Sequence, residues 1–139
     1  MKYENKKRNV IGITMGDPCG IGPEVVLKAL TSQRIRNEAD YVIIGSERIL
    51  RDVAENLTLK VKIHSHHRNS GFSKMVEGVS DGINVLDLGN VSGWDTFSRK
   101  PLPECGSASV EYIQEAISLV MGKRIDAMVT APVSKEAIK

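Results

Sequence analysis

The sequence has little of what marks several large classes of protein. Only 4% of its residues are aromatic and its net charge at pH 7 is +2, which argues against a nucleic-acid-binding surface. No apolar stretch approaches the roughly 20 residues of a membrane-spanning helix. The first residues, Met1 to Lys7, contain no hydrophobic signal core. We therefore expect a cytoplasmic protein that binds neither nucleic acid nor a membrane.

Cysteine and histidine are also scarce. Cys19 and Cys105 are the only cysteines and form no paired-cysteine motif, so we expect both to be reduced thiols of a cytosolic protein. A nucleophilic role for Cys19 is disfavoured because no histidine lies near it in the sequence. His64 and His66 would share one side of a strand, but with His67 they offer no evident third ligand in a stretch that resembles an exposed loop. We expect no metal ligands in this chain.

What the sequence does contain is an alternation of strand and helix patterns. Apolar runs predict strands over residues 10–15, 41–45, 59–64, 83–88 and 127–130. A first helix is predicted from Gly22–Glu24 to near Thr31–Ser32, with Val25, Val26, Leu27, Ala29 and Leu30 on its buried face. Further helices are predicted over 47–56 after the capping residue Ser46, from Ser107 or Ser109 to Gly122, and from Ser134 onward. The third of these helices carries an apolar stripe of Val110, Ile113, Ile117 and Val120. This alternation predicts an α/β fold with a mostly parallel sheet and helices on both faces, in one domain over residues 1–139.

Two longer connections interrupt this pattern. Residues 65–82 show little periodicity, and residues 91–104 contain Gly93, Pro101 and Pro103. Both are expected to be loops. Trp94 and Phe97, in the second connection, are expected to form a small packing cluster rather than a surface for stacking bases, because no basic groove flanks them.

Residues 9–24 form the most informative stretch. An apolar strand leads into a loop that contains Gly16, Gly20 and Gly22, and Pro23 and Glu24 then open a helix. A helix N-terminus behind a glycine loop exposes backbone N–H groups to an anion, and the missing Cβ atoms let a ligand approach the main chain.

This stretch does not match either of two common phosphate-binding motifs. The dinucleotide-binding pattern would need a third glycine where Val25 stands, and no Gly–Lys–Ser/Thr follows for a P-loop. The alternative is a plain strand–helix connection whose glycines only satisfy the turn, and the pattern alone leaves both interpretations open.

The residues of three segments also resemble those of a known protein family. Residues 13–24 closely resemble the N-terminal signature of the 4-hydroxythreonine-4-phosphate dehydrogenase family of vitamin B6 synthesis, which has a branch acting on threonate or erythronate 4-phosphates. Residues 126–137 are similar to the second signature of that family, and residues 104–113 to the helix that precedes it. The matches agree in order and spacing over nearly the whole chain. One departure is Cys19, where alanine is expected.

The resemblance implies a fold like that of isocitrate and isopropylmalate dehydrogenases, with two α/β domains, a cleft between them and a homodimer. It implies NAD-dependent oxidation of 4-phosphohydroxy-L-threonine, with decarboxylation to 3-amino-2-oxopropyl phosphate. A divalent metal (Zn, Mg or Co) polarises the substrate oxygen. D-threonate or D-erythronate 4-phosphate is the alternative substrate. The Gly–His–Thr–Glu motif and the metal-binding histidines of the family would follow residue 139, so we expect an N-terminal portion that is inactive alone.

Both signatures follow predicted strands, at the sheet edge where ligands collect in α/β folds. We expect Asp17 and Lys135 to act in catalysis. The expected cofactor-binding residues are Gly16, Gly20, Gly22, Pro23, Glu24, Thr130 and Pro132. From the residues alone, Asp17 could equally be a turn residue and Lys135 a solvated lysine at a helix start. A non-catalytic module that binds phosphate or a nucleotide, or a truncated product without function, are the alternatives at the level of the whole chain.

Overall fold

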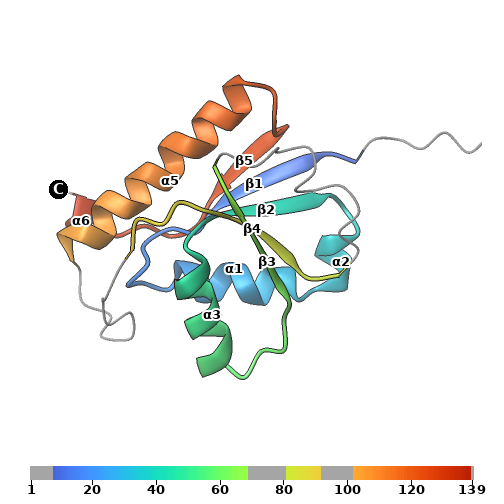
Figure 1. Cartoon of the computed structure of the whole chain (residues 1–139), viewed down its shortest axis with the longest axis horizontal. Helices are drawn as coiled ribbons and strands as arrows, with labels where there is room; N and C mark the ends of the chain where they lie inside the picture. Colours follow the sequence, from blue (N-terminus) through green and yellow to red (C-terminus); the bar gives the residue numbers. More distant parts are fainter. Residues whose placement is uncertain (1–7, 69–80, 92–101, 139) are drawn as a thin grey trace, which may run out of the picture.

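A computed structural model of the chain describes residues 8–68, 81–91 and 102–138. Within these residues a parallel sheet has five strands in the order β3-β4-β2-β1-β5. The strands are β1 (Val10–Thr14), β2 (Asp40–Gly45), β3 (Ile63–His67), β4 (Ile83–Asp87) and β5 (Ala127–Thr130). The helices are α1 (Gly22–Leu30), α2 (Gln33–Arg36), α3 (Glu47–Asn56), α5 (Pro103–Met121) and α6 (Lys135–Ile138). Helix α5 covers one face of the sheet, and α1 and α3 cover the other (Figure 1). The predicted α/β class is confirmed.

The core lies around the central strands. Val42, Ile43 and Ile44 of β2 and Val85 of β4 are fully buried, as expected for parallel strands covered on both faces. Strand β1 pairs with β2 through Ile13 and Ile43, and with β5 through Ile13 and Val129. Strand β5 forms an edge of this sheet, and Val129 is exposed there.

Successive strands are added to the sheet first on one side of β1 and later on its other side. From β1 the chain runs outward to β2 and then to β3 and β4, and helix α5 later carries it back to β5 on the other side of β1. Loops that follow the two strands at such a switch point leave the sheet on different sides, and the crevice between them is where parallel sheets bind ligands. The loops after β1 and β5 are the two segments with family signatures.

Helix α3 begins and ends where the sequence predicts. The hydroxyl of Ser46 accepts a hydrogen bond from the backbone N–H of Ile49 at 3.3 Å, which satisfies one of the free donors of the first turn. Helix α1 also follows the prediction, ending at the cap residue Thr31, but Val25 points to solvent while Val26 and Leu27 are buried. The short helix α2 was not predicted.

Helix α5 departs from the sequence-based expectation. It begins at Pro103 rather than at Ser107 or Ser109, because proline suits the first helical position and Glu104 lies beside the positive helix end. Ser109 is buried and its hydroxyl donates back to the carbonyl of Gly106 at 2.7 Å. The apolar stripe is not the buried face, and Ile117 within it is 48% exposed. Tyr112, Leu119 and several small residues are buried instead: Cys105, Gly106, Ala108, Ser109 and Ala116.

Strand β3 is shifted from its predicted position over residues 59–64. Its ladder with β4 begins at Ile63, opposite Ile83, so residues 59–62 precede the sheet. His64 and His66 share a side of this edge strand, and the expectation that residues 65–67 form a loop is wrong. Residues 69–80 of that expected loop, and Trp94 and Phe97 in the other one, lie outside the described residues.

Candidate functional site

The loops after β1 and β5 meet at the carboxyl ends of these two strands. The backbone N–H of Asp17 donates to the carbonyl of Pro132 at 3.2 Å, and the N–H of Ala131 donates to the carbonyl of Thr14 at 3.1 Å. Lys135 begins α6 three residues after Pro132. The structure therefore brings together the two signature segments, which are far apart in the sequence. We call residues 16–22 the glycine loop and residues 130–135 the second loop.

Two of the glycines serve this close approach. Gly16 has a φ of +79°, and a Cβ atom on it would overlap the carbonyl oxygen of Pro132. A Cβ atom on Gly22 would overlap the carbonyl oxygen of Met15 and lie 3.2 Å from that of Pro132. The space that these glycines leave is filled by the chain itself. Gly16 and Gly22 therefore fit the alternative interpretation, in which glycine is required by the path of the chain rather than by a ligand.

Asp17 shapes the glycine loop from within. Its side chain is 4% exposed, and its Oδ1 accepts a hydrogen bond from the backbone N–H of Cys19 at 2.8 Å. The N–H of Gly20 donates to the backbone carbonyl of Asp17 at 3.0 Å. This is the turn that aspartate side chains favour, in which the carboxylate replaces a backbone acceptor. A part in the chemistry for Asp17 stays a prediction.

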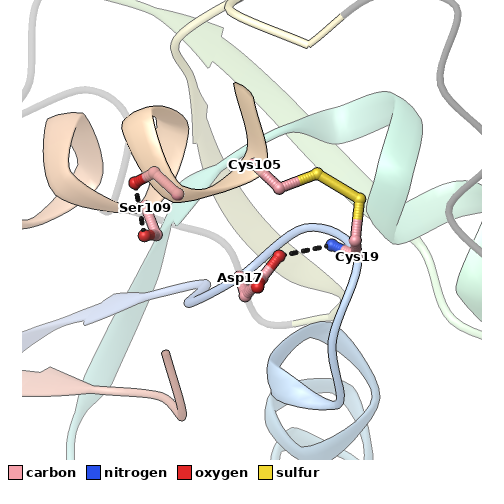
Figure 2. Close-up of a disulfide and its surroundings, with 5 residues drawn as sticks. Asp17, Cys19, Cys105 and Ser109 are labelled. Atoms are coloured by element: carbon pink, nitrogen blue, oxygen red, sulfur yellow. Dashed lines mark hydrogen bonds between the residues drawn. A yellow bond between two sulfur atoms is a disulfide. The ribbon is translucent and has the colours of Figure 1, made fainter. Parts of the chain in front are cut away.

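The expectation of two reduced thiols is wrong in this structure. Cys19 of the glycine loop and Cys105 in the first turn of α5 form a disulfide, with their Cα atoms 6.2 Å apart (Figure 2). The sequence hides this pairing because 86 residues separate the two positions. Helix α5 packs across β1, β2 and β5, and this brings its first turn over the glycine loop. The usable signal was that both cysteines stand in segments of the family resemblance.

The disulfide also determines whether a nearby group of three residues could bind a metal ion. Ligand atoms of Asp17, Cys19 and Cys105 lie within 4.8 Å of one another, and all three residues are buried. Because the sulfurs are bonded to each other, neither is a thiolate that could coordinate a metal. Among the residues that the structure describes, no other group of this kind has three potential ligands so close together.

Helix α5 is anchored independently of its cysteine. The hydroxyl of Tyr112 donates to Oδ1 of Asn90 at 2.9 Å, and the amide of Asn90 donates to Glu111 at 3.1 Å. Burial raises the pKa of Tyr112, with Asp87 and Glu111 adding to the effect, so its hydroxyl stays a neutral donor. The first turn of α5 is thus a fixed surface against which the glycine loop rests.

The parts of the site open to a ligand are fewer than the predicted set. Thr130, Pro132 and Lys135 of the second loop are exposed, as is Gly20 at the tip of the glycine loop. Helix α1 has no side-chain cap at its N-terminus. The remaining predicted residues lie deeper: Gly16, Asp17, Gly22 and Pro23 are buried, and Glu24 is half-buried and paired with Lys28 at 2.7 Å. A ligand would meet Gly20, Ile21 and the exposed residues of the second loop.

None of the helices in the described part of the chain is long and apolar enough to cross a membrane.

Comparison with known proteins gives a consistent result. The family model described as "Pyridoxal phosphate biosynthetic protein PdxA" matches residues 37–139. A protein of Fusobacterium nucleatum named "Putative D-threonate 4-phosphate dehydrogenase" is 35% identical over 132 residues, which is 95% of this chain and 39% of that protein. A 4-hydroxythreonine-4-phosphate dehydrogenase of Desulforapulum autotrophicum is 30% identical over 132 residues, 95% of this chain and 38% of that protein.

Solved structures show the same likeness. The crystal structure of a 4-hydroxythreonine-4-phosphate dehydrogenase from Burkholderia phymatum superposes with a TM-score of 0.84 at 32% identity, and the match covers 96% of this chain and 39% of that one. The chain therefore spans about two fifths of the length of these relatives.

Proposed function

The chain belongs to the PdxA family, and from this membership we propose that it supplies part of an NAD-dependent dehydrogenase that oxidises a 4-phosphorylated hydroxy acid. The names of its relatives support this, since they are dehydrogenases of 4-hydroxythreonine 4-phosphate or D-threonate 4-phosphate. The observation that carries the proposal is the meeting of the two signature loops at the switch point of the sheet, joined by the bond from Asp17 to Pro132. The activity is proposed for a protein of the full length of these relatives, of which this chain spans about two fifths.

When bound, NAD+ would supply the hydride acceptor for oxidation of the secondary alcohol of the substrate. The positive end of α1, which begins directly after the exposed Gly20 and Ile21, suits a phosphate group of the cofactor or the substrate. Lys135 is exposed in the second loop and would add a positive charge. Thr130 and Pro132 line the same edge. Asp17, Gly16 and Gly22 hold the glycine loop in place, so that these groups are fixed before a ligand arrives.

The metal that the family resemblance implies does not fit the described residues. The cluster of Asp17, Cys19 and Cys105 has its two sulfurs joined in a disulfide. Among the described residues this cluster therefore offers no metal site, and we propose that the metal ligands lie in the part of the relatives' length that this chain does not span. Homodimer formation and a cytoplasmic location are further parts of the proposal.

Two substrates compete. 4-Phosphohydroxy-L-threonine would give 3-amino-2-oxopropyl phosphate after loss of CO2, in vitamin B6 biosynthesis. D-threonate or D-erythronate 4-phosphate is the second candidate, and the 35% identity to the Fusobacterium protein favours it. Both substrates present a phosphate and a secondary alcohol, so the same loops would serve either one.

The test is NADH formation by the longer protein. We expect absorbance from NADH when the protein is mixed with NAD+, a divalent metal and one of the two substrates, and none with residues 1–139 alone. The ratio of kcat/KM for the two substrates then assigns the branch. If NAD+ binds but neither substrate yields NADH, the chain is a non-catalytic nucleotide-binding module, and the proposed reaction is wrong.

A further inference from the structure

The Cys19–Cys105 disulfide joins two elements of different rigidity. Cys19 lies near the tip of the glycine loop, and Cys105 lies in the first turn of a helix of 19 residues. Both are buried, with exposed fractions of 2% and 0%. Beyond Cys105, helix α5 packs on the sheet through Ala108, Tyr112 and Ala116, and the hydroxyl of Tyr112 donates to Asn90. Loss of the disulfide would therefore act on the loop and not on the helix.

The tip of the glycine loop is held mainly by its own hydrogen bonds. The N–H groups of Cys19 and Gly20 both bond to Asp17, at 2.8 and 3.0 Å. The base of the loop is tied to the second loop at Asp17 by its bond to the Pro132 carbonyl. The disulfide is thus a covalent tie between the tip of the loop and another element (Figure 2).

We propose that this pair is a reversible thiol–disulfide switch that sets the order of the glycine loop. In the oxidised form the loop is fixed against α5, with its N–H groups bonded to Asp17. In the reduced form the tip is released while the sheet and α5 keep their structure. The proposal concerns the loop itself and holds whether or not the longer protein is a dehydrogenase.

The chemistry is a balanced exchange with a dithiol. One thiolate of the reductant attacks a sulfur of the pair, the bond between Cys19 and Cys105 breaks, and the released cysteine takes up a proton. The second thiolate of the reductant then displaces the other cysteine, which is also protonated. The protein gains two electrons and two protons, and the reductant becomes a disulfide. An oxidised small-molecule disulfide, such as glutathione disulfide, reverses the process. Because both sulfurs are buried, exchange requires the loop to open away from α5.

The first measurement is a thiol count. The chain purified without reductant and then denatured should show no free thiol, and after treatment with a dithiol it should show two, from Cys19 and Cys105. Removal of the dithiol and addition of glutathione disulfide to the folded protein should return the count to zero. Two free thiols that persist in the presence of glutathione disulfide would overturn the proposal.

The second measurement is hydrogen exchange by mass spectrometry in the oxidised and reduced chain. We expect the exchange of amides in residues 15–22 to rise after reduction by about tenfold more than that of peptides from β2 and from the middle of α5, whose exchange follows only the loss of global stability. An equal factor of change in the loop and in the sheet would refute the switch and would indicate a purely structural disulfide.

A double variant, Cys19→Ala with Cys105→Ala, is the matched control. It should exchange like the reduced wild type in any buffer and should not respond to dithiol. A response of the variant to dithiol would show that the effect does not pass through this pair. Reduction of the unmodified chain needs no substitution, so the test stands even if the variant fails to fold. Neither readout uses NAD+ or substrate, so its failure is separate from failure of the proposed reaction.

Discussion

The glycine loop and the second loop lie at the same edge of the sheet but are built in opposite ways. The glycine loop is mostly buried, turned by its own aspartate and crosslinked to α5. The second loop buries Ala131 and exposes Thr130, Pro132 and Lys135. The difference teaches that a strong sequence motif can have two origins. In the glycine loop most residues are required by the packing of the chain on itself, whereas in the second loop Thr130, Pro132 and Lys135 are exposed to a ligand.

The glycine loop should therefore lose stability when its ties are removed, whereas the second loop should lose only binding. Four substitutions or treatments test this contrast, in decreasing order of the expected effect on the free energy of unfolding.

Reduction of the disulfide should have the largest effect. The crosslink closes a loop of 86 residues, and the chain-entropy model assigns such a closure about 4 to 5 kcal/mol of stability. Denaturant unfolding with and without a dithiol should show the midpoint moving down by the corresponding amount. The Cys19→Ala, Cys105→Ala chain should unfold at the lower midpoint in both buffers. Identical midpoints for the oxidised and reduced wild type would mean that the crosslink adds nothing to the glycine loop.

Gly16→Ala should follow, with a loss of about 3 kcal/mol. The new Cβ would overlap the Pro132 carbonyl, and alanine at a φ of +79° is strained. The matched control is Gly89→Ala, because Gly89 also has a positive φ of +62° but would place its Cβ in open space. That control should lose about 1 kcal/mol. Equal losses in the two variants would show that backbone strain alone, and not the approach of the two loops, requires glycine at position 16.

Asp17→Ala should cost about 1 to 2 kcal/mol, since the buried N–H of Cys19 would lose its acceptor. Asp17→Asn is the informative companion, because the amide oxygen can still accept that bond while the negative charge is gone. If Asp17 only shapes the turn, the asparagine variant keeps both its stability and its affinity for NAD+. If the carboxylate also acts on a ligand, the asparagine variant keeps its stability and loses affinity, and isothermal titration separates the two outcomes.

Much of the fold could be predicted because local signals were strong. Ser46 before an amphipathic stretch fixed α3, and Gly122 marked the end of α5. The start of α5 was missed because two serines offered a familiar cap, while the true start used Pro103 and left Leu102 as the cap residue. Its buried face was missed because most of that face consists of small residues, with Tyr112 and Leu119 as its large members, and a pattern of large aliphatic residues does not reveal it.

The location of the site could be predicted from the sequence, but the role of each residue in it could not. The sequence located both loops, and the parallel sheet brings them together through the bond from Asp17 to Pro132. The sequence could not reveal that carbonyl oxygens fill the space beside Gly16 and Gly22. These carbonyls belong to Met15 and to a residue more than a hundred positions away. The disulfide was missed for the same reason: a long-range contact has no local pattern.

Lys135→Ala should have the smallest effect on stability and thereby sharpens the contrast. Lys135 is exposed at the start of α6, so its removal should change the free energy of unfolding by less than about 0.5 kcal/mol. Affinity for NAD+ should fall about fivefold, which is the effect of one exposed charge near a phosphate group. Lys60→Ala, an equal change of charge at an exposed position ahead of β3, should leave both quantities unchanged. If Lys135→Ala instead destabilised the chain while NAD+ affinity stayed constant, the second loop would be a packing element like the glycine loop, and the division between the two would fail.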